Sequence, residues 1–220
     1  MKTYIAKAPK LLKLARKSLV WDIKTDKKEV FLTFDDGPTP EVTEFVLAEL
    51  KKYQAKATFF CIGKNIVNHP EVFEKVKTEG HSIGNHTHNH FNCAKHSHEA
   101  YIENIKLTED ILSNHNCNTT QKLFRPPYGR ISFKATKTIQ QKGFKIIMWD
   151  VISGDFDTNI SAEKCTSNVL NNVQPGSIVI FHDSVKAFPR LKETLPTVLS
   201  TLQNQGYSFS AIKQLNVILK

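Results

Sequence analysis

The chain has 220 residues, 40% hydrophobic and 23% charged, which excludes disordered, collagen-like and low-complexity proteins and suits a single α/β domain. Its formal net charge is +9, yet six of the basic residues and no acidic residue lie within residues 1–17. Nucleic-acid-binding modules carry their basic residues across a folded face or groove, so this distribution predicts no nucleic-acid partner.

The N-terminal segment, residues 1–28, is basic and carries leucines at loosely helical spacing. Two interpretations stay open: a solvated helix that packs its leucines on the domain, or an amphipathic segment, residues 1–17, that contacts anionic polymer or lipid. Its longest apolar run is too short for a secretory signal, and the chain has no run of the roughly 18 apolar residues that span a membrane. With four cysteines interpreted as free thiols, this predicts a cytoplasmic location by default, the cell envelope being the alternative.

From residue 29 to residue 220 we expect one domain in which short apolar runs alternate with amphipathic stretches. Strands are predicted over residues 30–34, 57–62, 82–84, 123–124, 144–149, 177–181 and 207–209. Helices are predicted over residues 41–53, 71–78, 98–114, 133–142, 162–171 and 191–204. This alternation indicates about seven parallel βαβ units. A (β/α) barrel is favoured over a doubly wound sheet, because no G-x-G-x-x-G motif follows the first strand.

Polar residues gather where the predicted strands end, which is where a barrel places its active site. They are Asp35 and Asp36, His86 to His90, Arg125 to Gly129, Asp150 and Asp155, and His182 and Asp183. Surface loops would scatter such residues instead. The sequence therefore predicts one site at the carboxyl ends of the strands.

Histidines are concentrated in one stretch, since five of the nine lie between His86 and His98. His86 and His90 are four residues apart, a spacing common among metal-chelating pairs because one helical turn puts both imidazoles on one face. The alternative is an ordinary polar loop, because H-x-x-x-H often occurs by chance. Five histidines receive no functional role: His69, His81, His96, His98 and His115.

Two adjacent aspartates end the first strand, and either would complete a two-histidine, one-carboxylate metal site. Side chains alternate along a strand, so Asp35 and Asp36 cannot point the same way. One can bind the metal while the other faces the substrate as a base. The competing interpretation is an Asx turn before Gly37 and Pro38.

Four motifs in this order resemble those of the polysaccharide deacetylases, the NodB homology domain of carbohydrate esterase family 4. They are Thr33–Pro38, His86–His90, Arg125–Gly129 and Ile180–Asp183. The resemblance covers about residues 29–210 and implies a distorted (β/α) barrel. It implies a metal-dependent hydrolase that removes N-acetyl groups from an amino-sugar polymer or oligomer, peptidoglycan-like or chitin-like. An O-acetyl glycan esterase and a catalytically weak glycan-binding relative are the alternatives.

The resemblance also implies the metal site and the base. Asp36, His86 and His90 match the family's ligands for a divalent metal, usually Zn²⁺. Asp35 matches the general base, and Arg125 matches the arginine that pairs with it.

The remaining roles follow from the later motifs. The backbone N–H of Tyr128 is expected to hold the oxyanion, and His182 to protonate the leaving amine. Tyr128, Trp149 and Phe156 are the expected substrate-binding residues. We expect a monomer that takes a carbohydrate substrate.

One motif departs from the family pattern, which reads Trp-x-x-Asp-x-x-Asp-Trp after the fifth strand. Here Ile152 stands where the first aspartate is common, and Phe156 replaces the last tryptophan. If nothing replaces that aspartate, His182 should have a lower pKa than its counterparts in the family. Asp150 and Asp155 are the candidate substitutes.

Overall fold

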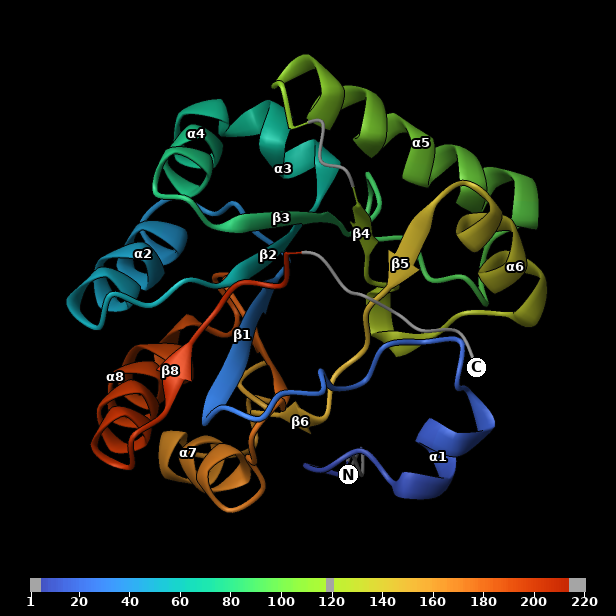
Figure 1. Cartoon of the computed structure of the whole chain (residues 1–220). Helices are drawn as coiled ribbons and strands as arrows, with labels where there is room; N and C mark the ends of the chain where they lie inside the picture. The colour runs from blue at the N-terminus through green and yellow to red at the C-terminus, as the bar shows by residue number, and fades with distance from the viewer. Residues whose placement is uncertain (1–4, 118–120, 214–220) are drawn as a thin grey trace.

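Parallel strands and their connecting helices form a ring (Figure 1). The structure is a computed structural model that describes residues 5–117 and 121–213. Its strands are β1 (Glu29–Asp35), β2 (Thr58–Cys61), β3 (Ser82–Asn85), β4 (Lys122–Phe124), β5 (Phe144–Ile146), β6 (Val151–Ile152), β7 (Ile178–His182) and β8 (Ser208–Phe209). Its helices are α1 (Lys10–Ala15), α2 (Val42–Lys52), α3 (Gly63–Asn68), α4 (Pro70–Thr78), α5 (His98–Asn114), the 3₁₀ turn η1 (Pro127–Gly129), α6 (Phe133–Gln141), α7 (Ala162–Leu170) and α8 (Phe188–Asn204).

Seven strands follow the order β5-β4-β3-β2-β1-β7-β6, all paired in parallel, and β8 pairs with β1. The two ends of this order, β5 and β6, are consecutive in the chain. The N–H of Ile147, directly after β5, donates to the carbonyl oxygen of Phe124 in β4 (2.8 Å). The N–H of Asp150 instead donates to the carbonyl oxygen of Ile178 in β7 (2.9 Å). One stretch of chain therefore crosses from β4 to β7 and closes the ring. The distorted (β/α) barrel is confirmed, and the strand predicted over residues 144–149 is interrupted by this crossing.

The N-terminal segment fills the gaps beside the crossing. Val20 exchanges backbone hydrogen bonds with residues 146 and 148 (2.9 and 2.7 Å), and residues 6 and 8 pair with residues 152 and 150 (2.9 and 2.8 Å). Helix α1 lies outside the ring between α6 and α7, where no helix connects β5 to β6 (Figure 1). Leu19 and Trp21 are buried, but Leu11 and Leu14 of α1 are 81% and 60% exposed. The expectation that this segment packs its leucines on the domain is therefore wrong for α1.

Asp150 anchors the N-terminal segment and is itself fully buried. Its Oδ1 accepts from the Lys13 ammonium at 2.5 Å, and its Oδ2 accepts from the Lys7 ammonium at 2.6 Å and the Ser177 hydroxyl at 2.5 Å. Burial would raise the pKa of Asp150, but the two lysines and Ser177 outweigh it and lower this pKa. Both carboxylate oxygens are engaged here, so Asp150 is not the substitute for the missing family aspartate.

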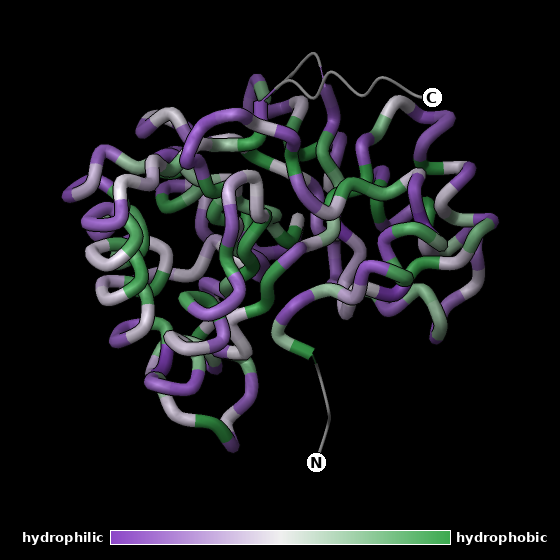
Figure 2. The backbone as a smooth tube through the Cα atoms, turned by 60° about the horizontal axis from the view of Figure 1, so that its bottom comes forward, coloured by the Kyte–Doolittle hydropathy of each residue, from purple (hydrophilic) through white to green (hydrophobic). Residues whose placement is uncertain are grey.

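The strands are apolar on both faces because helices cover one face and the barrel interior receives the other. Leu32 and Phe34 of β1 pack toward the helices, whereas Phe31 packs inside the barrel with Phe60 and Ile178. Figure 2 shows this distribution, with hydrophobic backbone in the middle of the molecule and hydrophilic stretches along its outer turns.

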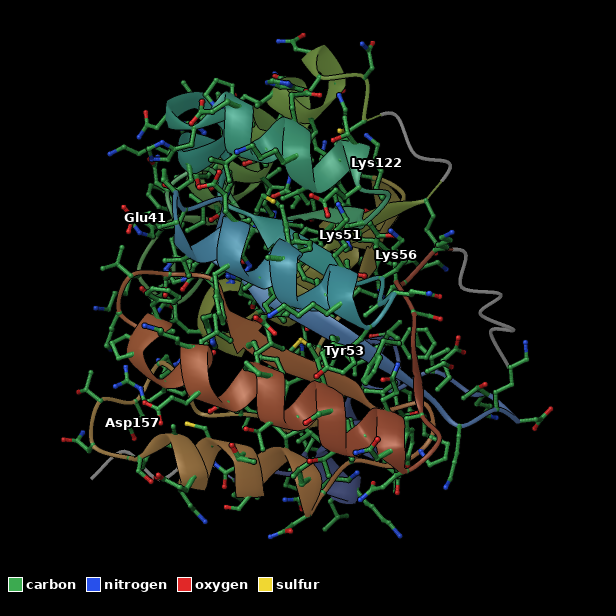
Figure 3. All side chains as sticks on the ribbon, turned by 90° about the vertical axis from the view of Figure 1, so that its left-hand side faces the viewer. Glu41, Lys51, Tyr53, Lys56, Lys122 and Asp157 are labelled. Atoms are coloured by element: carbon green, nitrogen blue, oxygen red, sulfur yellow. The ribbon has the colours of Figure 1, made fainter. Side chains whose placement is uncertain are left out.

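The two ends of the barrel are seen side-on in Figure 3. Glu41 and Asp157, which follow β1 and β6, lie toward one end, and Lys56 and Lys122, which lie where β2 and β4 begin, lie toward the other. Among the described residues, no helix has the length and apolar character needed to cross a membrane.

Helix α3 lies between residues 62 and 71, where no helix is predicted. Its six residues are too few to show a helical period. The helix begins at Gly63, whose backbone lies close to α5 and to His88. A Cβ at this position would lie 2.6 Å from Thr108 Oγ1 and 2.7 Å from His88 Nδ1, so only glycine fits.

Candidate active site

Side chains from five strand ends meet at one end of the barrel, as the sequence predicts. These are Asp35 and Asp36 at β1, His86 and His90 after β3, Arg125 after β4, Asp155 after β6 and His182 at β7.

Asp36, His86 and His90 form a cluster in which one ligand atom from each lies within 4.8 Å of the others. Asp36 Oδ1 is 3.3 Å from His90 Nε2 and 3.8 Å from His86 Nε2. His86 Nδ1 lies 2.8 Å from the carbonyl oxygen of Arg125, which can only accept, so Nδ1 carries the proton and Nε2 of the neutral ring faces Asp36. His90 Nδ1 lies 3.1 Å from the Tyr128 hydroxyl, so its Nε2 also faces Asp36.

The cluster fits a divalent metal. Among the described residues, Asp36 Oδ1 is buried and has no hydrogen-bond partner. A buried acceptor left unpaired beside two imidazole nitrogens is costly unless a cation binds there. Two histidines and a carboxylate are a common protein donor set for catalytic Zn²⁺.

The charge states of these side chains suit metal binding, which requires neutral imidazole and ionised carboxylate. Burial and the neighbouring His86 lower the pKa of His90 to about 4. Burial raises the pKa of Asp36, but His182, His86 and His90 outweigh it, so this pKa lies below its usual value.

The backbone is strained where the candidate ligands are attached. Asp36, Thr87 and His90 have φ values of 83°, 64° and 54°, and Tyr128 has φ of 60°. Non-glycine residues rarely adopt this left-handed region, which costs on the order of 1–3 kcal/mol at each position. Such residues persist only where their surroundings hold them.

Polar side chains hold these turns, with Asn104 and Asp183 buried and Asn65 half-buried, and sequence analysis gives them no role. Asn65 Nδ2 donates to the carbonyl oxygen of Asp36 (2.7 Å), and Asp183 Oδ1 accepts from the N–H of Gly37 (3.0 Å). Asn104 Oδ1 accepts from the N–H groups of residues 88 and 89 (2.8 and 2.9 Å), between the two histidine ligands. An asparagine inside a predicted helix carries no signal for such a contact. Burial raises the pKa of Asp183 to about 7.

One carboxylate oxygen of Asp35 accepts from a buried cation, and the other faces the cluster of Asp36, His86 and His90. Its Oδ1 accepts from Arg125 Nη1 at 2.8 Å, and its Oδ2 lies 3.7 Å from His86 Nε2. Arg125 is completely buried and also donates to the Thr33 hydroxyl and to the carbonyl oxygens of residues 147 and 148 (2.7, 3.2 and 2.7 Å). Its guanidinium lies 4.2 Å from the centre of the Phe60 ring. Burial lowers the pKa of Arg125, but a guanidinium with this many acceptors stays charged beside Asp35.

His182 has a carboxylate partner, Asp155. Asp155 Oδ1 lies 2.8 Å from His182 Nδ1, and Oδ2 accepts from the backbone N–H of His182 at 2.8 Å. Arg190 Nε donates to the carbonyl oxygen of Asp155 at 2.6 Å. Burial would lower the pKa of His182, but Asp155 raises it to about 9. The condition for a low pKa of His182 is therefore not met: Ile152 is buried, and Asp155, one of the two candidate substitutes, takes the place of the missing aspartate.

A pocket of about 410 Å³ opens beside the metal cluster. It is lined by Asp36, Pro38, Thr39, Ile62, Asn65, His69, His90, Ser184 and Val185. His69, which receives no role from the sequence, therefore lies in the site region.

Two of the expected substrate-binding aromatics, Tyr128 and Phe156, border His90 and His182 rather than this pocket. The Tyr128 ring lies 4.6 Å from the His90 ring and is 61% exposed, and the Phe156 ring lies 5.1 Å from the His182 ring. Trp149 packs against Gly129, where a Cβ would come within 2.5 Å of its ring.

The chain is similar to a known protein family along more than half its length. A profile of the polysaccharide deacetylase family matches residues 22–147. A Bacillus cereus peptidoglycan-N-acetylglucosamine deacetylase is 38% identical over 80% of this chain and 70% of that protein. A chitooligosaccharide deacetylase of Azorhizobium caulinodans is 32% identical over 73% of this chain and 76% of that protein.

Solved structures show the same architecture. The crystal structure of the Bc1960 peptidoglycan N-acetylglucosamine deacetylase aligns with a TM-score of 0.84 at 34% identity, covering 93% of this chain and 95% of that one. A family pseudoenzyme from Bacillus anthracis, BA3943, aligns with a TM-score of 0.77 at 26% identity, covering 89% of this chain and 67% of that one. Active and inactive relatives therefore share this fold, so the fold by itself does not show activity.

Proposed function

The chain belongs to the polysaccharide deacetylase family, as a polysaccharide N-deacetylase, and on that premise we propose that it removes acetyl groups from N-acetylglucosamine units of peptidoglycan. The relatives reported above support the substrate, since two of them bear that activity in their names. The observation that carries the chemistry is the juxtaposition, at one end of the barrel, of the metal cluster and two ion pairs, Asp35–Arg125 and His182–Asp155.

In this proposal Asp36, His86 and His90 hold the metal, which we infer to be Zn²⁺ from the two imidazoles and one carboxylate. When bound, such a metal makes water more acidic and polarises a carbonyl oxygen.

Asp35 is the proposed general base. Its Oδ2 faces the cluster 3.7 Å from His86 Nε2, where it can accept a proton from the attacking water. Arg125 donates to Oδ1, which fixes the carboxylate and leaves Oδ2 as the oxygen turned toward the cluster.

His182 is the proposed general acid. Its pKa of about 9 keeps it protonated at neutral pH, so it can donate a proton to the leaving amine. The hydrogen bond from Nδ1 to Asp155 leaves Nε2 as the nitrogen that donates. The backbone N–H of Tyr128, in η1 at the rim of the site, is the proposed donor to the oxyanion that forms as the acetyl carbon is attacked.

Acetate release from a substrate panel tests the proposal. The purified protein with Zn²⁺ is incubated with N-acetylated peptidoglycan fragments, chitooligosaccharides and O-acetylated xylan. Faster release from peptidoglycan is expected. Faster release from chitooligosaccharides would change the substrate, and faster release from xylan would make the protein an esterase. Metal and glycan binding without acetate release would identify a catalytically weak relative.

A further inference from the structure

A cluster of apolar and basic side chains is exposed on α1 and the beginning of α6. We call it the α1 patch. It consists of Lys10, Leu11, Leu12, Leu14, Lys17, Phe133, Lys134 and Lys137, all of which are exposed. Leu11, Leu14 and Phe133 are 81%, 60% and 75% exposed. Arg16 joins the two helices, with its guanidinium 4.4 Å from the centre of the Phe133 ring.

The exposed leucines are not required to hold α1 in place. This helix has six residues, none of them buried, and a helix so short is unstable without outside contacts. Its contacts are polar: Lys13 pairs with Asp150, and the carbonyl oxygen of Arg16 accepts from Trp21 Nε1 at 3.3 Å. The fold thus fixes α1 from its inner side and directs the leucines to the solvent.

The α1 patch is positively charged. Lys10 and Lys17 are exposed, and residues 1–17 contain no acid. Among the described residues, three acidic groups pair with this region: Asp150, which contacts Lys7 and Lys13, Asp22, 2.6 Å from Lys13, and Glu99, 3.6 Å from Lys134. Each is therefore balanced by a lysine, which leaves the net charge of the patch positive.

We propose that the α1 patch docks on the surface of an anionic lipid bilayer. Leucine and phenylalanine insert among headgroups and acyl chains, and lysines gain from the negative surface potential, which together give interfacial binding. A soluble anionic polymer would use the lysines but not the leucines. A second copy of the patch would bring like charges together.

Docking through this surface keeps the active site near the bilayer. Phe133 begins α6, the helix that follows η1 and Tyr128 at the site end of the barrel. The proposal goes beyond the deacetylation proposed above, because it concerns where the enzyme is held rather than the bond it cleaves.

Vesicle flotation tests the proposal, with the full chain and vesicles of phosphatidylcholine alone or with 30% phosphatidylglycerol. We expect binding to the anionic vesicles, with affinity at least about 25-fold above that for the neutral ones, falling as salt rises. The double variant Lys10→Glu, Lys17→Glu should lose at least about 25-fold, since each lysine near an anionic surface contributes about five-fold.

The double variant Leu11→Ser, Leu14→Ser separates this proposal from its alternatives. It should lose binding about ten-fold or more, while acetate release from soluble substrate stays unchanged. The matched control is Val67→Ser, Leu107→Ser, on α3 and α5, where the side chains are 58% and 41% exposed and binding should persist.

Three results would overturn the proposal. The first is equal binding of the parent and the leucine variant to anionic vesicles, which indicates adsorption by charge alone. The second is no vesicle binding together with leucine-independent binding of polyphosphate, which makes a soluble polymer the partner. The third is no vesicle binding together with a dimer that the leucine variant abolishes.

Discussion

Asp150 and Asp35 are both buried and both pair with basic side chains, and they differ in how their oxygens are used. Both carboxylate oxygens of Asp150 accept hydrogen bonds, from Lys13, Lys7 and Ser177. Asp35 uses Oδ1 for Arg125 and turns Oδ2 toward the metal cluster. A buried carboxylate whose acceptors are all engaged holds structure, whereas one with an oxygen left over can take up a proton.

Changing Asp35 should give the largest effect on rate. Asp35→Asn keeps the shape and an acceptor for Arg125 but removes the basic oxygen, so we expect kcat to fall about 10²–10⁴-fold. Metal content, measured by elemental analysis, should be unchanged because the cluster of Asp36, His86 and His90 remains. An Asp35→Asn enzyme with near-parental kcat would place the base elsewhere.

Changing Asp150 should affect stability instead. Asp150→Asn leaves the Lys7 ammonium without its carboxylate and Lys13 with Asp22 alone, and we expect the free energy of unfolding to fall by about 2–3 kcal/mol. Because Lys7 is 30% exposed and Lys13 18%, this lies below the cost of breaking a fully buried pair. Urea unfolding gives the free energy, and kcat on soluble substrate serves as the control. A large fall in kcat with unchanged stability would reverse the assignment of the two aspartates.

Changing Asn104, which supports the loop of residues 86–90, should have a smaller effect, and on metal affinity rather than on rate. Asn104→Ala removes the side-chain oxygen that accepts from the N–H groups of residues 88 and 89, while the N–H of residue 88 keeps the backbone carbonyl oxygen of residue 104 (3.1 Å). The left-handed turn that positions His90 therefore loses part of its support. We expect metal affinity to fall about 10-fold, the lower end for residues that orient ligands. Competition with a chelator measures it. Asn114→Ala, at the opposite end of α5, is the matched control and should retain parental affinity.

The second ion pair of the site predicts a shift in pH dependence. Activity should fall as pH rises through about 9, where His182 loses its proton. Asp155→Asn should move this alkaline limb to lower pH by about one unit or more, as the pKa of His182 returns toward 6.5. Because the folded-state pKa is raised, the Asp155–His182 pair stabilises the fold fully below pH 6.5 and loses this contribution as pH rises through about 9.

A variant at the divergent position gives the control for that shift. Ile152→Asp should leave the alkaline limb in place, since His182 already has Asp155. A limb that moves to higher pH in Ile152→Asp would show that Asp155 tunes His182 incompletely.

The barrel and most of the site could be predicted because their signals are local. Apolar runs predict the strands, and the polar motifs follow the strand ends. Because the strands are parallel, their carboxyl ends lie at one end of the barrel, where these motifs meet. The choice between Asp150 and Asp155 could not be made, because it depends on the turn at Gly154, where φ is 85°. Asn65 and Asn104 carry no signal either, since a polar residue in a helix looks the same in the sequence whether it faces solvent or a strained loop.

Closure of the ring by the N-terminal segment also sets an order of events during synthesis. Lys7 is made early, but its partner Asp150 lies 143 residues later in the chain. Contacts of such separation form late and slow folding. Until the ribosome has delivered β5, β6 and β7, the first residues have no strand edge to pair with. The basic, leucine-bearing segment around α1 is therefore synthesised well before its partners and stays unpaired until most of the barrel has emerged.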